Sequence, residues 1–99
     1  MEITKNQKDL LDFLGSDYSV KIIDGVECLY RKINDYYDIE ISGALRKNSK
    51  IDVFVWRLNK GSAIEIVERH FDIKDWTALK HLLNQIVEKY SDSTQLRTE

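Results

Sequence analysis

The sequence predicts an α+β protein with a helix at each end and an antiparallel meander of four or five strands between the helices. Residues in the middle of the chain alternate between apolar and polar with a period of two, and short turn signals break this pattern. A capping pattern opens the first helix, and apolar residues spaced three and four apart mark the last one. We expect one domain over residues 1–90 and a flexible polar tail over residues 91–99.

The first helix is expected from about Lys5 to Leu14. Thr4 followed by Gln7 is a capping-box pattern, in which a hydroxyl and an amide each satisfy a backbone donor at the helix start. Gly15 can adopt the left-handed conformation that closes a helix. The apolar residues of this segment gather near its end, so it offers only a small apolar face for packing.

The first three strands follow from the period of two and from the turns between them. Residues 18–22 form the first strand, and Asp24-Gly25 is a strong signal for a two-residue hairpin turn. We expect the second strand over residues 26–33 and the third over residues 37–43, with a turn at residues 34–35.

The fourth and fifth strands follow a polar loop at residues 46–50. Residues 51–58 are rich in branched and aromatic side chains, which favours a strand. After a turn at residues 59–61, residues 63–69 alternate isoleucine with glutamate. This pattern favours a fifth strand, but periodicity alone leaves a helix open over so short a segment.

The last helix begins after Asp75, which is a good N-cap residue. Its apolar residues recur at spacings of three and four, so we expect the helix to lie on the sheet with its polar side in water. These apolar residues are Trp76, Leu79, Leu82, Leu83, Ile86, Val87 and Tyr90.

The composition favours a small intracellular protein. The chain has 99 residues and a net charge of −2, so there is no general attraction to nucleic acid or to anionic lipid. The single cysteine, Cys28, excludes an intramolecular disulfide and suits a reducing cytosol. Residues 1–8 contain no apolar run, so we expect neither a signal peptide nor a membrane anchor, and a cytoplasmic location.

The sequence contains no motif for catalysis or for cofactor binding. The two histidines, His70 and His81, lie in no nucleophile motif and have no metal-ligand spacing. The four glycines are isolated, so no phosphate-binding loop is present. Cys28 lies in the middle of a predicted strand, which is more typical of a small core residue than of a reactive thiol. We therefore expect no enzyme activity, no metal and no cofactor.

Three carboxylates in one hairpin arm form the first candidate binding surface: Asp35, Asp38 and Glu40. Alternation with Ile39 and Ile41 predicts that Asp38 and Glu40 point into solvent. Their arrangement fits either an ordinary solvated face or an acidic binding surface.

The fourth predicted strand supplies the second candidate surface, because it is apolar on both faces. Ile51, Val53 and Val55 share one face, and Phe54 and Trp56 share the other. If both helices cover the same face of the sheet, Phe54 and Trp56 form an exposed aromatic patch, which is the usual mark of a partner site. If one helix covers each face, both aromatic residues belong to the core.

A basic segment between residues 44 and 60 forms the third candidate surface. It holds one acidic residue and five basic ones, which are Arg46, Lys47, Lys50, Arg57 and Lys60. With Trp56 as a stacking platform, these residues fit a nucleic-acid-binding surface. Charges at loop tips and edge strands also serve to prevent aggregation, so this second explanation stays open.

The first 40 residues resemble the start of small phage-encoded type II-A anti-CRISPR proteins. The segments that carry the resemblance are Lys8-Asp9-Leu10-Leu11, Ser16-Asp17-Tyr18-Ser19-Val20-Lys21-Ile22, Tyr30-Arg31-Lys32-Ile33-Asn34 and Ile39-Glu40-Ile41-Ser42. The second half of the chain departs from the more acidic sequence of that family.

The resemblance implies a non-catalytic inhibitor that binds Cas9 through an acidic surface standing in for DNA phosphates. Its candidate residues here are Asp35, Asp38 and Glu40, together with Asp24 and Glu27. A net charge of −2 and the basic segment at residues 46–60 depart from DNA mimicry. Inhibition through a different surface of the nuclease is compatible with this departure.

The function that we expect from the sequence is inhibition of a Cas9-like host defence nuclease by protein–protein contact, by a phage or mobile-element protein. Two alternatives stay open. One is a nucleic-acid-binding module built on the basic segment, and the other is a homodimeric scaffold protein assembled through the Phe54 and Trp56 face or through a strand edge.

Overall fold

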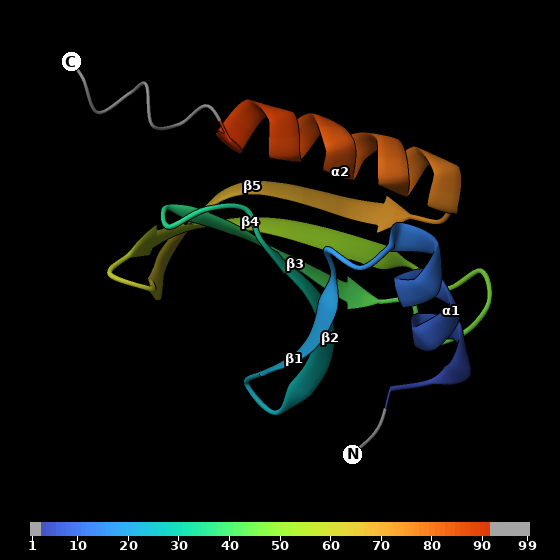
Figure 1. Ribbon diagram of the computed structural model, residues 1–99. Helices are drawn as coiled ribbons and strands as arrows, with labels where there is room; N and C mark the ends of the chain where they lie inside the picture. The colour runs from blue at the N-terminus through green and yellow to red at the C-terminus, as the bar shows by residue number, and fades with distance from the viewer. Residues whose placement is uncertain (1–2, 92–99) are drawn as a thin grey trace.

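The structure of the protein is a computed structural model that describes residues 3–91 (Figure 1). Its elements are α1 (Lys5–Leu14), β1 (Ser19–Ile23), β2 (Val26–Lys32), β3 (Tyr37–Gly43), β4 (Ile51–Asn59), β5 (Ser62–Ile73) and α2 (Trp76–Ser91). The strands form one antiparallel sheet in which their order follows the chain. The predicted α+β class is confirmed. Residues 63–69, for which the sequence allowed a strand or a helix, belong to strand β5. The expected polar tail lies outside the described residues, apart from Ser91.

Two hairpins are closed by tight turns whose residues have positive φ angles. Asp24 and Gly25 join β1 to β2 with φ of 52° and 79°, and Lys60 and Gly61 join β4 to β5 with φ of 54° and 83°. Two consecutive positive φ angles give a turn whose twist matches that of the flanking strands. In the β2–β3 turn, the side-chain oxygen of Asn34 accepts hydrogen bonds from two backbone amides, at 2.8 and 3.1 Å.

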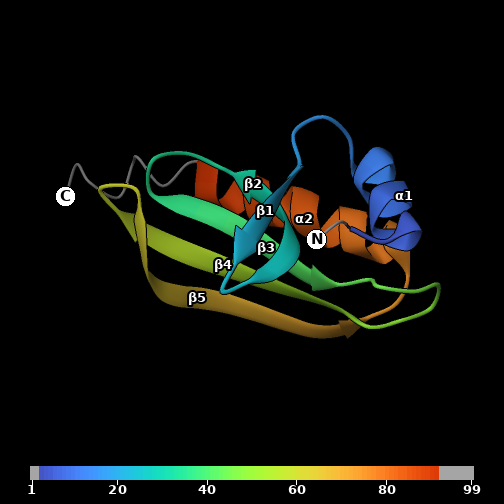
Figure 2. The same ribbon diagram turned by 90° about the horizontal axis from the view of Figure 1, so that it is seen from below.

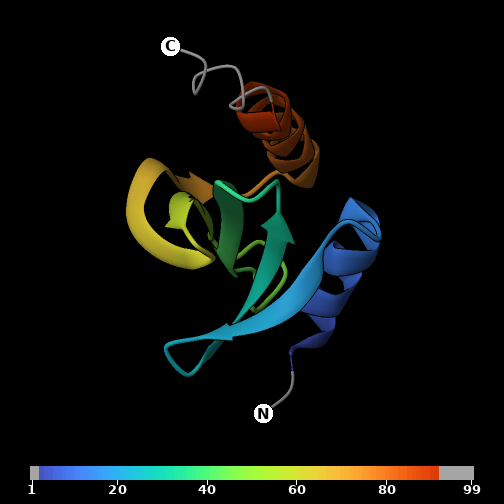
Figure 3. The ribbon, with the colours of Figure 1, turned by 60° about the vertical axis from the view of Figure 1, so that its left-hand side comes forward.

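Both helices pack on the same face of the sheet. Figure 2 shows the strands with α2 behind them, and Figure 3 shows both helices on one side of the curved sheet. The buried cluster that joins the helices to the sheet includes Leu10, Leu14, Leu29, Ile39, Ile41, Val53, Val55, Leu79, Leu83 and Ile86. The opposite face, which we call the open face, is therefore not covered by either helix.

Glu68 accepts three hydrogen bonds, two of which link β5 to α2. Its carboxylate accepts them from Nζ of Lys89 at 2.8 Å, from the hydroxyl of Tyr90 and from Nε2 of His70 at 2.9 Å. Burial raises the pKa of Glu68, but the hydrogen bonds from these three side chains outweigh it and lower the pKa to about 2. The ionised carboxylate therefore stabilises the docking of α2 at neutral pH.

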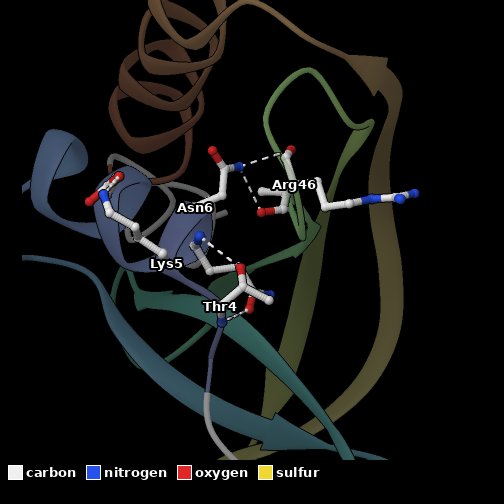
Figure 4. Close-up of polar contacts among 7 residues, drawn as sticks. Thr4, Lys5, Asn6 and Arg46 are labelled. Atoms are coloured by element: carbon white, nitrogen blue, oxygen red, sulfur yellow. Dashed lines mark hydrogen bonds and ion pairs between the residues drawn. The ribbon is translucent and has the colours of Figure 1, made fainter.

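Asn6 of α1 holds the β3–β4 loop, residues 44–50. The side-chain amide of Asn6 donates hydrogen bonds to the carbonyl oxygens of Ala44 at 2.8 Å and Arg46 at 3.1 Å, while the guanidinium of Arg46 points away from α1 (Figure 4). The loop backbone is thus fixed by the helix, and the basic side chain at position 46 is left exposed.

Gln7 both caps α1 and holds the end of β3. The predicted capping box is confirmed, because the Thr4 hydroxyl accepts from the backbone amide of Gln7 at 3.1 Å and the side-chain oxygen of Gln7 accepts from the backbone amide of Thr4 at 2.9 Å. The side-chain amide of Gln7 donates to the carbonyl of Gly43 at 3.2 Å. Gly43 has a φ of 88°, and a Cβ atom there would lie 2.3 Å from the carbonyl oxygen of Lys50. Only glycine fits this position.

Candidate binding site on the open face of the sheet

The open face consists of the side chains that alternate with the core residues along each strand. On β3, Ile39 and Ile41 are buried against the helices, so Asp38 and Glu40 lie on the open face. The cross-strand pairs place further side chains beside them, which are Cys28 and Tyr30 on β2, Phe54 and Trp56 on β4, and Ile66 on β5. The β1–β2 and β4–β5 hairpins bend toward this side of the sheet (Figure 3), so the open face is concave.

Asp38 is buried, with 5 % of its surface exposed, although the alternation predicted that it points into solvent. The prediction was right about the face and wrong about the exposure, because the concave sheet places Tyr30 and Trp56 around the carboxylate. Atom Oδ1 of Asp38 has no hydrogen-bond partner among the described residues. Burial raises the pKa of Asp38, and the negative charge of Glu40 raises it further. A hydrogen bond with Tyr30 and the positive charge of Lys21 lower this pKa, but they do not cancel the effect of burial.

Glu40 is half-buried, and two neighbouring strands fix its carboxylate. Trp56 donates from Nε1 to Oε1 of Glu40 at 3.0 Å, and the thiol of Cys28 donates to Oε2 at 3.7 Å. Burial, together with the nearby carboxylate, raises the pKa of Cys28 to about 11. Cys28 is buried as expected, but it lies on the open face instead of in the cluster beneath the helices.

Phe54, Trp56 and Phe71 form an aromatic patch on the open face. The rings of Phe54 and Phe71 meet edge to face, with centroids 5.8 Å apart and planes at 75°. For the case in which both helices cover one face, the sequence predicted that Phe54 and Trp56 are exposed. They do lie on the uncovered face, but both are half-buried, whereas Phe71 is exposed. Phe71 was missed because the fifth strand was expected to end near Arg69, whereas β5 continues to residue 73.

Two adjoining cavities of about 330 Å³ each hollow the open face, and both are lined by Glu40 and Trp56. The first is mainly apolar, and its other walls include Val26, Cys28, Phe54 and Ile66. The second, which we call the acidic pocket, is also lined by Lys21, Ile23, Tyr30, Asp38 and Ala63. The two central carboxylates of the face thus lie beside aromatic rings and an apolar groove.

Asp35 does not belong to this site. It lies in the β2–β3 turn, is exposed, and forms an ion pair with Lys32 at 3.3 Å. Of the three carboxylates that the sequence grouped, the structure brings together only Asp38 and Glu40.

The five basic residues of the segment at 44–60 do not gather on one surface. Arg46, Lys47 and Lys50 lie in the β3–β4 loop, whereas Arg57 and Lys60 lie at the other end of β4. This strand has nine residues, which corresponds to about 30 Å at 3.3 Å per residue.

Two of these basic side chains also have acidic partners. Arg57 pairs with Glu65 at 2.6 Å, and Lys50 pairs with Asp72 at 3.5 Å. Within the described residues, two of the five basic charges are therefore paired inside the protein itself.

Comparisons with protein-family models, with curated proteins and with solved structures found no match for this chain. The fold and the site therefore define the protein by class, as an α+β protein with a five-stranded antiparallel meander and a concave acidic and aromatic face. Among residues 3–91, no helix has the length and apolar character needed to cross a membrane.

Proposed function

We propose that this chain is a non-catalytic binding protein that uses its open face to inhibit a Cas9-like defence nuclease by protein–protein contact. The observation that carries this proposal is a sheet face that neither helix covers, on which aromatic and acidic side chains lie side by side. Exposed apolar patches rimmed by polar groups are typical of partner sites. Aromatic side chains also provide much of the binding energy at such interfaces.

The charges of the open face favour a partner that presents basic residues. Asp38 and Glu40 form no ion pair with a described residue, in contrast to Glu65 and Asp72 on β5. A basic partner surface would complement these carboxylates and would speed association. The resemblance of the first 40 residues to type II-A anti-CRISPR proteins supports a Cas9-type nuclease as the partner.

The test is a pulldown of Cas9 loaded with its guide RNA, followed by a DNA cleavage assay with excess protein. Phe71→Glu places a charge on the aromatic patch at a side chain that is 57 % exposed, so the fold should tolerate the change. We expect inhibition to weaken at least about tenfold, as for an aromatic interface residue. Leu45→Glu is the matched control, because Leu45 is 55 % exposed and lies in the β3–β4 loop.

Undiminished cleavage at excess protein would refute this target. Equal inhibition by Phe71→Glu and by the unchanged chain would refute the open face as the interface. Loss of inhibition in Leu45→Glu alone would place the interface at the β3–β4 loop instead.

A further inference from the structure

We propose that the acidic pocket is a binding site for an organic cation with a guanidinium or ammonium head group. Asp38 and Glu40 would hold the charge of this group, and the rings of Tyr30 and Trp56 would flank it. The inference goes beyond the proposed inhibition, because it concerns the chemistry of the pocket and does not depend on the nuclease.

The first argument is the unpartnered oxygen of Asp38. A polar atom that is buried without a hydrogen bond destabilises a protein, so such atoms are rare and call for a donor. Oδ1 of Asp38 is buried, lacks a partner among residues 3–91, and belongs to a side chain that lines the pocket. A bound N–H group would supply the missing hydrogen bond.

The second argument is that two carboxylates line the same pocket. Asp38 and Glu40 are two residues apart on β3, so both side chains lie on the open face. Hydrogen bonds from Trp56 and Cys28 hold the Glu40 carboxylate in place without neutralising it. A site that is held in its binding geometry loses little entropy on binding. The repulsion between the two carboxylates would be relieved by a cation between them.

The third argument is the aromatic wall, which already attracts a cation. Nζ of Lys21 lies 4.2 Å from the centroid of the Tyr30 ring. Lys21 is exposed on the edge strand β1, and even with Lys21 nearby, Oδ1 of Asp38 has no hydrogen-bond partner in the described part of the chain. Trp56, on the opposite side of the pocket, belongs to the residue type whose ring binds cations most strongly. Rings of this kind favour an organic cation over a metal ion, which prefers a shell of oxygen ligands.

The experiment is a titration of the whole chain with methylguanidinium, and with methylurea as its neutral isostere, at constant ionic strength. NMR spectroscopy follows the indole N–H signal of Trp56, which the Trp76→Phe variant distinguishes from the second tryptophan. Because Nε1 of Trp56 donates a hydrogen bond to Glu40, this signal reports directly on the pocket. We expect a saturable shift with methylguanidinium and none with methylurea.

Three variants connect the signal to the pocket. Asp38→Asn keeps the shape of the side chain and should weaken binding at least about tenfold, because a charged hydrogen bond is lost. Lys21→Gln should strengthen binding about threefold, because a competing cation is removed. Asp35→Asn is the matched control and should leave the affinity unchanged, because Asp35 lies outside the pocket. Circular dichroism checks that each variant is folded.

A capped tripeptide with a central arginine identifies the source of the cation. If the peptide binds about tenfold more tightly than methylguanidinium, the site takes a side chain of a protein; if it does not, the site takes a free small cation. Equal shifts with methylurea, a shift without saturation, or unchanged affinity in Asp38→Asn would overturn the inference. Weaker binding by Lys21→Gln would also overturn it. Cation binding without nuclease inhibition would support this site and refute the proposed target. Nuclease inhibition without cation binding would support the proposed target and refute this site.

Discussion

Replacing Glu68 by glutamine should destabilise the protein and remove part of its sensitivity to acid. The pKa of Glu68 falls from 4.5 to about 2 in the folded state. Linkage converts a depression of this size into about 3 kcal/mol of unfolding free energy at neutral pH. The side chain of Lys89 is 63 % exposed, so water screens part of its attraction to the carboxylate. We therefore expect Glu68→Gln to lower the free energy of unfolding by about 2 kcal/mol at pH 7.

The effect should depend on pH in one direction. Because the pKa of Glu68 is lower in the folded than in the unfolded state, its stabilisation is complete above about pH 5. It is lost as the pH falls toward the folded-state pKa of about 2. Urea unfolding of both chains at pH 7, 4 and 2.5, followed by circular dichroism, should therefore show their stabilities converging in acid.

Glu65→Gln is the matched control, since it makes the same substitution on the same strand. Glu65 is exposed and pairs with the exposed Arg57, and such surface pairs contribute at most about 1 kcal/mol. Equal losses of stability for Glu65→Gln and Glu68→Gln at pH 7 would refute this reasoning. A loss for Glu68→Gln that is the same at pH 7 and pH 2.5 would refute it as well.

Two further predictions concern Gly43 and Cys28. Gly43→Ala should lower the free energy of unfolding by about 3 kcal/mol, because the new methyl group would meet the carbonyl of Lys50 at a positive φ. Gly61 has a similar φ but open space around it, so Gly61→Ala should lower the free energy of unfolding by only about 1 kcal/mol. Equal losses of stability for the two variants in urea unfolding would contradict the steric explanation. Cys28 should resist alkylation by iodoacetamide at pH 8 until urea unfolds the chain, because its thiol is buried and its pKa is about 11. If Cys28 of the folded protein were labelled as fast as a free thiol, it would be accessible and the prediction would be wrong.

The parts of the fold that could be predicted from sequence are those that depend on local geometry. The Asp24-Gly25 turn and the capping box of Thr4 and Gln7 need only residues close together in the chain. The true end of β5 was missed because the strand pairing is irregular near Asp72, which has a φ of 62°. Such an irregularity interrupts the alternation on which the prediction depended.

The placement of the helices could not be predicted, because it is a tertiary property. Phe54 and Val55 are both apolar, so the pattern of β4 fits a strand covered on one face or on both. Val20 and Ile22 alternate like core residues, yet both remain exposed on the edge strand β1. The periodicity of a strand separates its two faces but does not show which of them is covered.

The candidate site could be predicted only in part. Asp38, Glu40, Phe54 and Trp56 were identified from sequence, but the burial of Asp38 depends on the curvature of the sheet. Tyr30 could be recognised only from the strand register, which places it opposite Glu40. Register and curvature both depend on how distant segments pack, and the alternation of residue types carries neither.

The chain-ordered strands also have a consequence for how the protein folds. Each sheet pairing closes only a short stretch of chain, so little entropy is lost before each contact forms, and topologies rich in such contacts fold quickly. The contacts of Asn6 are different, since they join residues 38 and 40 positions apart. α1 is therefore held in place by partners that are synthesised only after three further strands, β1, β2 and β3, have followed it.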